Sequence, residues 1–300
     1  MKKKTYLFTL MAMALTLGSC SDNENGIGGE TSKYITVSTS IGNMTRVATD
    51  ANGGQTFEEG DEISVYAWTG DATVAPETRE RVVNNAINKL TNGSWISTPQ
   101  MLWKNNRDKH YFIGVYPISA ISDLSAGEYT FDVNKQTESD LLVAVNKDGL
   151  SYNVDEQQTV PLTFTHVMAK LVVNLTYKNQ WGGIPTVEKV IVGNAAKEAT
   201  INYLTKVVTP STTAKEDFSL PEITENTKYV SVIIPQEEVT QLTIVIGGKN
   251  FVYDNGTPFK LESGKITTVN LEVGRDEIKL GDVKITDWEN GSTFKGEALN

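Results

Sequence analysis

Cysteine and histidine, on which most metal sites and many catalytic sites depend, are nearly absent from this chain. Its 300 residues include one cysteine, Cys20, and two histidines. If Cys20 is modified, as argued below, no thiol remains for a disulfide, a zinc–thiolate site, an iron–sulfur cluster or a nucleophile. A hydrophobic core alone must then hold the fold, and roughly 280 residues suffice for one large or two ordinary domains.

The motifs of common catalytic sites are also missing. The sequence has no His-Glu-x-x-His pair, no Gly-x-Ser-x-Gly elbow, no phosphate-binding glycine loop and no EF-hand spacing. His110 and His166 each lie in an apparent strand, which favours a packed or hydrogen-bonded side chain over a catalytic one. A glycosidase with two carboxylates leaves no linear signature, but residues 60–62, Gly-Asp-Glu, are better interpreted as a turn before a strand at 63–68. We expect no enzyme activity, no cofactor and no metal site, and keep a hydrolase only as the weakest alternative.

Clusters of lysine and arginine are absent too, and the formal net charge is −10. Loss of residues 1–19, discussed next, removes three lysines and no acidic residue, which changes the charge to −13. Phosphate backbones repel a surface this acidic. Nucleic acid is therefore not expected as a partner.

The first 20 residues have the pattern of a secretory leader that ends in a lipidation site. Three lysines precede an uncharged, mostly apolar stretch at 6–17, which is too short for a lasting transmembrane helix. The Leu-Gly-Ser-Cys sequence at 17–20 resembles a bacterial lipobox. We therefore expect residues 1–19 to be a lipoprotein signal peptide and Cys20 to carry the lipid anchor, the alternative being an ordinary leader with a chance cysteine.

The segment behind Cys20 is polar and rich in glycine. Residues 20–33 show no hydrophobic periodicity, so they are expected to form a flexible tether. Asp22 and Glu24 resemble the signal that exports some Bacteroidetes lipoproteins to the outer face of the outer membrane, although a solvated spacer would read the same way.

Beyond the tether, apolar and polar residues alternate with period two. Ile35, Val37, Thr39 and Ile41 share one face of an extended segment, and similar alternation recurs at 167–177, 242–246 and 269–273. This pattern puts one face of each strand in a core and the other in water, as in antiparallel sandwiches. The sequence therefore predicts an all-β fold, and without βαβ units a parallel sheet is not expected.

Two details of the all-β interpretation are less clear. Residues 77–90 have apolar side chains at helical spacing, but their asparagines and the Asn-Gly turn at 92–93 favour a strand or a short turn. The Asp-Asn-Gly sequence at 254–256 predicts a hairpin between 251–253 and Phe259.

The domain boundary is predicted from a change in pattern near residue 165. A polar, turn-like segment at 148–158 gives way to an apolar run that leads into a long strand at 166–177. Residues 34–164 would form an N-terminal β-sandwich domain and residues 165–300 a C-terminal one, without an internal sequence repeat.

The residues also resemble a known family along nearly the whole chain beyond the tether. The chain is similar to the Bacteroidales fimbrillin family, the subunits of lipoprotein-derived (type V) pili. The matching segments occur in order at 35–41, 45–46, 60–67, 111–117, 136–144, 162–171, 234–236 and 263–265, with a terminal Ile285-x-x-Trp288. Each segment alone is a weak signal, but their order behind a lipobox is specific.

The resemblance implies two transthyretin-like antiparallel β-sandwich domains in tandem and assembly by strand exchange. In fimbrillins the precursor reaches the outer membrane as a lipoprotein, and an arginine-specific protease cuts behind an N-terminal strand. That strand then leaves its groove, and a segment of a neighbouring subunit replaces it. On this chain the resemblance implies a plug strand with the residues Ile35, Val37, Thr39 and Ile41. It also implies a cleavage site between Arg46 and Val47.

The donor strand and the partners follow from the same resemblance. Residues 289–300 are too polar to fill a groove, so the C-terminal strand with Val283, Ile285 and Trp288 would be the donor. Other fimbrial subunits, the outer membrane and surface ligands of a host or another bacterium would be the partners. Shaft and accessory roles (anchor, tip or terminator) both stay open, because Arg46 could be an uncut surface arginine.

A different class of function is the alternative. A surface lipoprotein that never polymerises could bind glycans or host proteins through aromatic side chains. The candidate tryptophans for this role are Trp68, Trp95, Trp103 and Trp181. Burial in the core is the simpler interpretation of all of them.

Overall fold

The computed structural model describes residues 33–42, 56–153, 156, 158–239, 241–253 and 258–288. Nearly all of the regular structure in these residues is β-strand, and the helical part is one 3-10 turn, η1 (Thr78–Glu80). The prediction of an all-β fold is confirmed. In the described part of the chain, no helix has the length and apolar character needed to cross a membrane.

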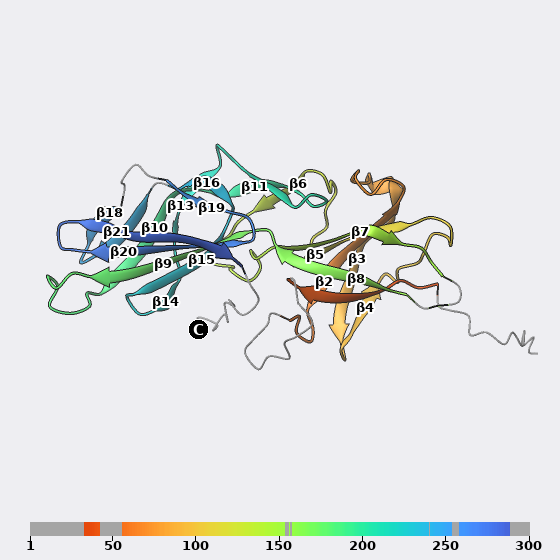
Figure 1. Cartoon of the computed structure of the whole chain (residues 1–300), viewed down its shortest axis with the longest axis horizontal. Helices are drawn as coiled ribbons and strands as arrows, with labels where there is room; N and C mark the ends of the chain where they lie inside the picture. The colour runs from red at the N-terminus through yellow and green to blue at the C-terminus, as the bar shows by residue number, and fades with distance from the viewer. Residues whose placement is uncertain are drawn as a thin grey trace, which may run out of the picture.

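The first half of the chain is built around a seven-stranded sheet with the order β1-β8-β7-β5-β2-β3-β4 (Figure 1). Its strands are β1 (Thr36–Ile41), β2 (Glu62–Thr69), β3 (Arg81–Thr91), β4 (Ser94–Thr98), β5 (His110–Tyr116), β7 (Leu142–Leu150) and β8 (Thr159–His166). The two edge strands approach each other, since the indole Nε1 of Trp95 on β4 donates to Thr39 Oγ1 on β1 at 3.0 Å. The sheet is therefore strongly curled.

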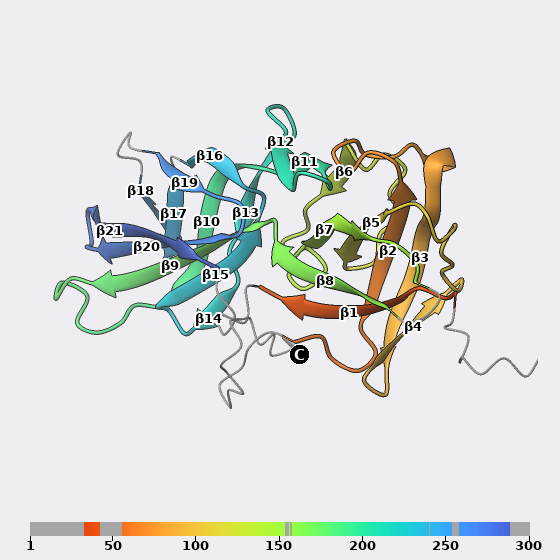
Figure 2. The same ribbon diagram turned by 45° about the vertical axis from the view of Figure 1, so that its right-hand side comes forward.

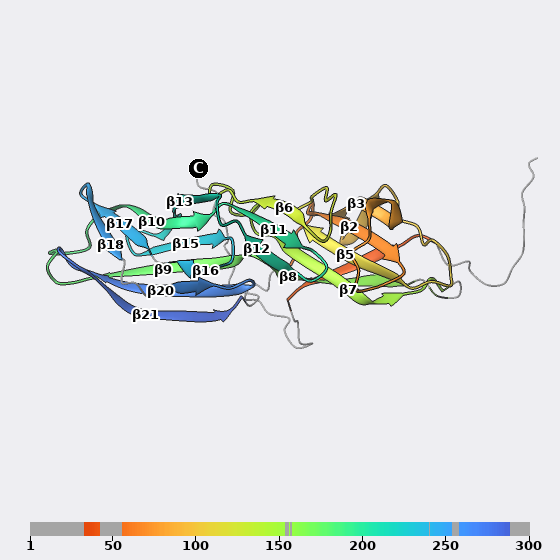
Figure 3. The ribbon, with the colours of Figure 1, turned by 90° about the horizontal axis from the view of Figure 1, so that it is seen from above.

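The second half is a sandwich of several smaller sheets. One layer has the order β14-β15-β9-β20-β21, the other has the order β13-β10-β17-β18, and β16 pairs with β19. Seen from above, β20 and β21 lie on the side away from β10 and β13 (Figure 3). The strands are β9 (Ala169–Tyr177), β10 (Val187–Ala196), β13 (Lys215–Ser219), β14 (Glu222–Thr224), β15 (Lys228–Ile233), β16 (Gln236–Val239), β17 (Leu242–Ile246), β18 (Lys249–Tyr253), β19 (Phe259–Leu261), β20 (Lys265–Val273) and β21 (Ile278–Asp287).

A three-stranded sheet joins the two halves. Its order is β12-β11-β6, and it unites β6 (Gly127–Thr130) with β11 (Glu198–Asn202) and β12 (Val207–Pro210). Since β6 comes from the first half and β11 from the second, the two halves share a sheet between them (Figure 1).

The buried apolar residues form two clusters, one on each face of the seven-stranded sheet. Ile63 and Val65 of β2 belong to the cluster inside the curl, which also holds the buried residues of β1. Tyr66 and Trp68 of the same strand belong to the second cluster, which continues through the sandwich. Both faces of β2 are thus buried, which explains its almost unbroken apolar sequence.

Two strand pairs depart from the antiparallel pairing expected of the sandwiches. β1 runs parallel to β8, and β9 runs parallel to β20. In both pairs a long stretch of chain separates the strands, which leaves room for the crossover that parallel pairing requires. Alternation of apolar residues indicates which face of a strand is buried but not the direction in which the strand runs relative to its neighbour. The two parallel pairs could therefore not be predicted from the sequence.

The hairpin predicted around residues 254–256 is also wrong. β18 pairs with β17 across Gly247 and Gly248, which have φ of 58° and 71°, whereas β19 pairs with β16. Residues 254–257 lie outside the described residues, but the strands on either side of them belong to different sheets. The two glycines supply the tight turn instead, because positive φ is nearly free of strain in glycine.

The other two local predictions are partly right. Residues 81–91 form a strand behind η1, as favoured, and Asn85 adopts a φ of 55° where the register with β2 shifts. The strand predicted at 166–177 begins at Ala169, because His166 still pairs with Leu142 at the end of β8. The predicted domain boundary after residue 164 falls inside β8 and stays a prediction.

Candidate functional site

β1 lies at the edge of the curled sheet and is held mainly by β8. The two strands pair in register from Thr36 with Thr159 to Ile41 with Phe164, and Gly42 N donates to Phe164 O at 2.8 Å. Figure 2 shows β1 beside β8 and next to β4. Every backbone contact of this ladder joins residues more than a hundred positions apart. β1 is therefore held in the sheet by a segment distant in the sequence and not by a hairpin with its neighbour in the chain.

The residues just before β1 make a second set of contacts. Ile35 N donates to Met101 O at 3.0 Å, and Trp103 N donates to Lys33 O at 3.2 Å. The chain therefore contacts the segment that follows β4 just before it pairs with β8 as β1.

The side chains predicted for the plug strand lie where the alternation places them. Ile35, Val37 and Ile41 are buried in the cluster inside the curl, with at most 6% of each exposed. Thr39 is half-buried and accepts the hydrogen bond from Trp95 described above. The structure brings the four residues to one face of β1, and their role as a removable plug stays a prediction.

A groove remains between β1 and β4. It has a cavity volume of about 800 Å³ and is lined by β1 itself, by Trp95 and Ile96 of β4, and by Phe57. The ring of Phe57 packs edge-on against Trp95 and Phe164 at centroid distances of 5.3 Å and 5.2 Å. β1 is thus covered by protein on the side of β8 and borders a hollow on the other.

The predicted lipidation and cleavage sites belong to segments outside the described part of the chain. Cys20, the signal peptide 1–19, the tether except for Lys33, and Arg46 with Val47 lie outside the described residues. The sequence alone puts Arg46 four residues beyond Gly42, the last described residue behind β1.

The predicted donor strand is β21, at the edge of the five-stranded sheet. It pairs with β20 along its whole length, from Ile278 opposite Val273 to Asp287 opposite Lys265. Val283 is 37% exposed and Ile285 is 39% exposed, although Val269, which lies opposite Val283, is fully buried. β21 therefore has a backbone ladder with one neighbour, interrupted by a register shift at Gly281, and none of its side chains is fully buried.

Trp288, the third predicted donor residue, lies just beyond β21 and has different contacts. Its backbone N–H donates to Gly264 O at 3.0 Å. Its indole ring stacks on the ring of His166 at a centroid distance of 3.9 Å and an interplanar angle of 5°. Lys170 Nζ lies 5.3 Å from the centre of the Trp288 ring. The end of the described chain is thus attached where β8 gives way to β9.

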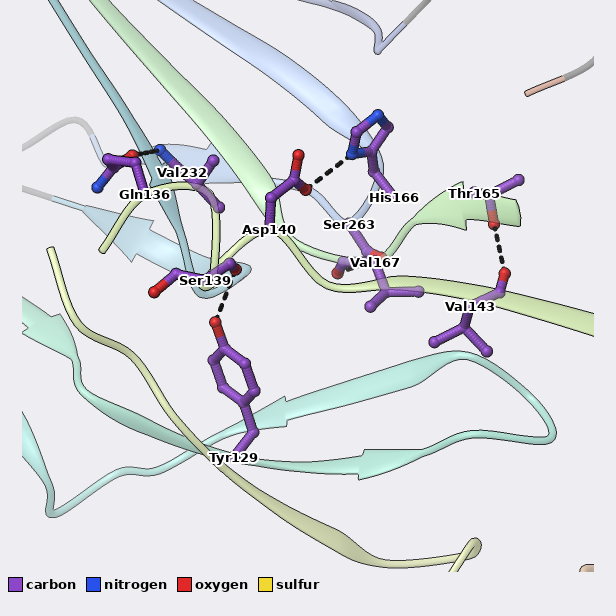
Figure 4. A network of polar contacts seen from close by, with 10 residues as sticks. All are labelled: Tyr129, Gln136, Ser139, Asp140, Val143, Thr165, His166, Val167, Val232 and Ser263. Atoms are coloured by element: carbon purple, nitrogen blue, oxygen red, sulfur yellow. Dashed lines mark hydrogen bonds and ion pairs between the residues drawn. The ribbon is translucent and has the colours of Figure 1, made fainter. Parts of the chain in front are cut away.

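Both histidines have structural surroundings. His110 is buried, its Nδ1 donates to Asp108 O at 3.1 Å, and its Nε2 accepts from Lys104 N at 3.0 Å. Burial lowers the pKa of His110, which favours the neutral ring that this arrangement needs. His166 Nδ1 donates to Asp140 Oδ1 at 2.8 Å (Figure 4). The ring nitrogens of His110 and the Nδ1 of His166 are therefore committed to hydrogen bonds within the fold.

Asp140 belongs to a polar network that sequence reasoning did not predict. Tyr129 OH donates to Ser139 O at 2.7 Å, and Val232 N donates to Gln136 Oε1 at 2.6 Å (Figure 4). These bonds tie the segment before β7 to β6 and β15. Residues 136–144 carry part of the family resemblance, but nothing in their spacing indicates these partners.

The tryptophans do not form an exposed aromatic platform. Trp68 and Trp103 are buried. Trp95 and Trp181 are half-buried, and the Nε1 of Trp181 donates to Val273 O at 3.0 Å. Within the residues that the structure describes, no three His, Cys, Asp or Glu side chains are grouped so that they could hold a metal ion.

Comparison with known proteins gives this arrangement a family. A family model described as fimbrillin-like matches residues 45–288. The chain belongs to the fimbrillin-like family. It is 25% identical, over 97% of both chains, to the Bacteroides uniformis protein named "Putative fimbrium subunit Fim1C".

Solved structures show the same fold. A "putative cell adhesion protein" from Bacteroides uniformis superimposes with a TM-score of 0.62 at 20% identity, covering 85% of this chain and 98% of the other. One from Bacteroides ovatus gives 0.64 at 18% identity with the same coverage. The tip fimbrial protein Mfa3 from Porphyromonas gingivalis gives 0.50 at 10% identity, covering 77% and 95%. Membership in the fimbrillin-like family makes this chain a structural protein of the cell surface and not an enzyme.

Proposed function

We propose that this fimbrillin-like protein is a subunit of a cell-surface fimbria that assembles by strand exchange. Its own β1 would leave the groove beside β8, and a strand of a neighbouring subunit would take that place. The observation that carries the proposal is the position of β1, an edge strand whose apolar residues fill the curled sheet and which precedes Arg46 in the sequence.

The physics of exchange follows from what β1 covers. Without β1, the outer edge of β8 would expose unpaired N–H and C=O groups, and the sites of Ile35, Val37 and Ile41 would be empty. Each such side chain contributes about 1.5–3 kcal/mol when it is fully buried. An incoming strand with apolar residues at every second position satisfies the edge and the sites together. Because donor and acceptor surfaces differ, successive contacts would extend into a fibre.

β21 is the donor strand in this proposal, with Val283, Ile285 and Trp288 as its apolar residues. It can leave its own sheet by breaking one ladder with β20, and Val283 and Ile285 are already more than a third exposed. Most of the core beneath β20 would stay covered, because only the half-buried Ile278, Leu280 and Trp288 of this segment pack against it.

Export and domain organisation complete the proposal. Residues 1–19 would be removed, Cys20 would anchor the precursor in the outer membrane through residues 20–33, and a protease would cut between Arg46 and Val47. We also propose that residues 34–164 and 165–300 are two transthyretin-like sandwich domains in tandem. The separate main sheets of the two halves support this division, although β6 pairs across it and one buried cluster takes residues from both halves.

Limited trypsin digestion of the purified monomer tests the exchange. Wild-type protein should be nicked early behind Arg46 and should then form oligomers whose amount rises with protein concentration. Arg46→Ala should block both steps, whereas Arg107→Ala, at an exposed loop position, should block neither. Oligomers that form equally well without the nick, or a nicked protein that unfolds instead of exchanging, would count against the mechanism.

A further inference from the structure

β21 can open from one end only. A short turn joins it to β20, with Gly274 N donating to Glu277 O at 2.8 Å, so the start of β21 is held by the chain itself. Peeling must begin at the other end, at Asp287. Trp288 follows directly, and its side chain has the best-packed position of this end of the strand.

The contacts of Trp288 reach three different parts of the fold. The His166 ring comes from the end of β8, Lys170 from the start of β9, and Gly264 from the turn before β20. Stacked aromatic rings and a cation over a ring face stabilise such a site beyond the effect of burial alone. The hydrogen bond from His166 to Asp140 fixes the plane of the ring on which Trp288 lies.

The attachment of Trp288 is incomplete in one respect. Among the residues that the structure describes, the indole Nε1 of Trp288 has no hydrogen-bond partner although the atom is buried. A buried donor without a partner costs free energy relative to the same group in water. Stacking therefore stabilises the ring in this position, whereas burial of the Nε1 donor destabilises it. Exposure of the ring to water would remove the second contribution.

We propose that the stack of Trp288 on His166 is a latch that keeps β21 on its own subunit until it is donated. The latch rests on the proposed function for its purpose, but its mechanical part concerns the monomer alone. With the stack formed, fraying of β21 from Asp287 is blocked. With the stack broken, β21 is held mainly by its backbone ladder with β20 and peels from its C-terminal end.

Hydrogen exchange of the full-length monomer tests the latch directly, because it reports local opening of each segment. Trp288→Ala and Trp288→Leu should both speed exchange of the amides at 283–287 at least tenfold, while exchange in β9 and β15 stays at the wild-type rate. Trp288→Phe keeps a ring and removes the unpartnered Nε1, so exchange should match wild type or be slower. Thr286→Ala, an exposed neighbour on the same strand, serves as the control.

Two results would overturn the latch. One is exchange at 283–287 that stays at the wild-type rate in both the Ala and the Leu variants. The other is exchange that quickens equally in β9, β15 and β21, since Trp288 would then be an ordinary core contact.

The same variants separate the latch from the exchange proposal. After trypsin digestion, Trp288→Ala should form oligomers faster than wild type. Faster opening of β21 without oligomers in either protein would keep the latch and reject strand exchange. If both proteins form oligomers but β21 opens at the same rate in both, strand exchange is supported and the latch is rejected.

Discussion

Lys170 is a buried cation at the contact between the two halves of the molecule. It is 5% exposed, and burial lowers its pKa to about 8, against a partial opposing effect of Asp140. Lys228 lowers it further, and the ring of Trp288 lies near its Nζ. The folded state therefore holds the Lys170 proton less tightly than the unfolded chain, whose lysines titrate near pH 10.4.

This difference predicts a stability that rises with pH. Between about pH 8 and 10.4 the unfolded chain binds more protons at Lys170, so the free energy of unfolding should increase, by about 2 kcal/mol from pH 7.5 to 9.5. Lys170→Met should remove this increase, and Lys189→Met, at an exposed position, should retain it. Denaturant unfolding at several pH values measures it, and a parallel rise in wild type and Lys170→Met would contradict the assignment.

Buried tyrosines set the highest pH at which this rise in stability can be measured. Burial raises the pKa of Tyr116 to about 12 and also raises that of Tyr66. Above pH 10 the folded state keeps protons that the unfolded chain loses, so stability falls there. Lys206, whose pKa burial also lowers, contributes in the same direction as Lys170 in all the proteins compared.

At the scale of single residues, sequence reasoning predicted burial well and partners poorly. The two histidines were expected to be packed or hydrogen-bonded, and the structure shows contacts of that kind. The partners of His166 are Asp140, 26 positions earlier, and Trp288, far later in the chain. No local pattern encodes a contact between such distant positions.

Among the secondary-structure elements, β1 offers a clean comparison between its two faces. Val37 is buried inside the curl, whereas Ser38 is exposed. Val37→Asp should remove about 1.5–3 kcal/mol of burial and add the cost of an unpaired carboxylate, so β1 should leave its groove. Ser38→Asp should change stability by less than about 0.5 kcal/mol.

Hydrogen exchange in the edge of β8 measures the loss of β1. Amides at 160–164 that bond to β1 should exchange faster in Val37→Asp and stay protected in Ser38→Asp. Equal protection in both variants would mean that β1 is not held by its buried face.

The faces of the strands were predictable from alternation, but their neighbours were not. The face of β1 with Ile35, Val37 and Ile41 was predicted from period two alone and is buried as expected. Its parallel pairing with β8 depends on how the chain crosses over between them, which alternation does not record. The same limit explains the failed hairpin at 254–256, where a good turn sequence connects strands of different sheets.

At the scale of the whole molecule, the two halves share a β-sheet and a buried apolar cluster. β6 from the first half pairs with β11 from the second, and one buried cluster takes residues from both, including Tyr66 and Tyr203. The all-β class was predictable because alternation occurs in both halves. The shared sheet was not, because its pairing joins residues about 70 positions apart. The proposed division near residue 165 thus runs through a molecule in which one buried cluster extends across both halves.

Gly127 is the position where this connection can be tested. A Cβ atom on Gly127 would lie 2.5 Å from Cε2 of Tyr203, which is 2% exposed and cannot move away easily. Gly127→Ala should therefore push β6 away from β11 and destabilise the protein by about 1–3 kcal/mol, as overpacking does. Glu128→Ala, on the same strand but exposed, should have little effect.

The decisive result is which parts of the molecule lose stability in Gly127→Ala. If β6 joins the halves into one cooperative unit, calorimetry should show a single transition at a lower temperature, by several degrees for a chain of this size. Hydrogen exchange should then quicken together in β5 of the first half and in β17 of the second. A transition that splits in two, or faster exchange confined to β11, would show that the halves unfold independently and that the shared sheet does not couple them.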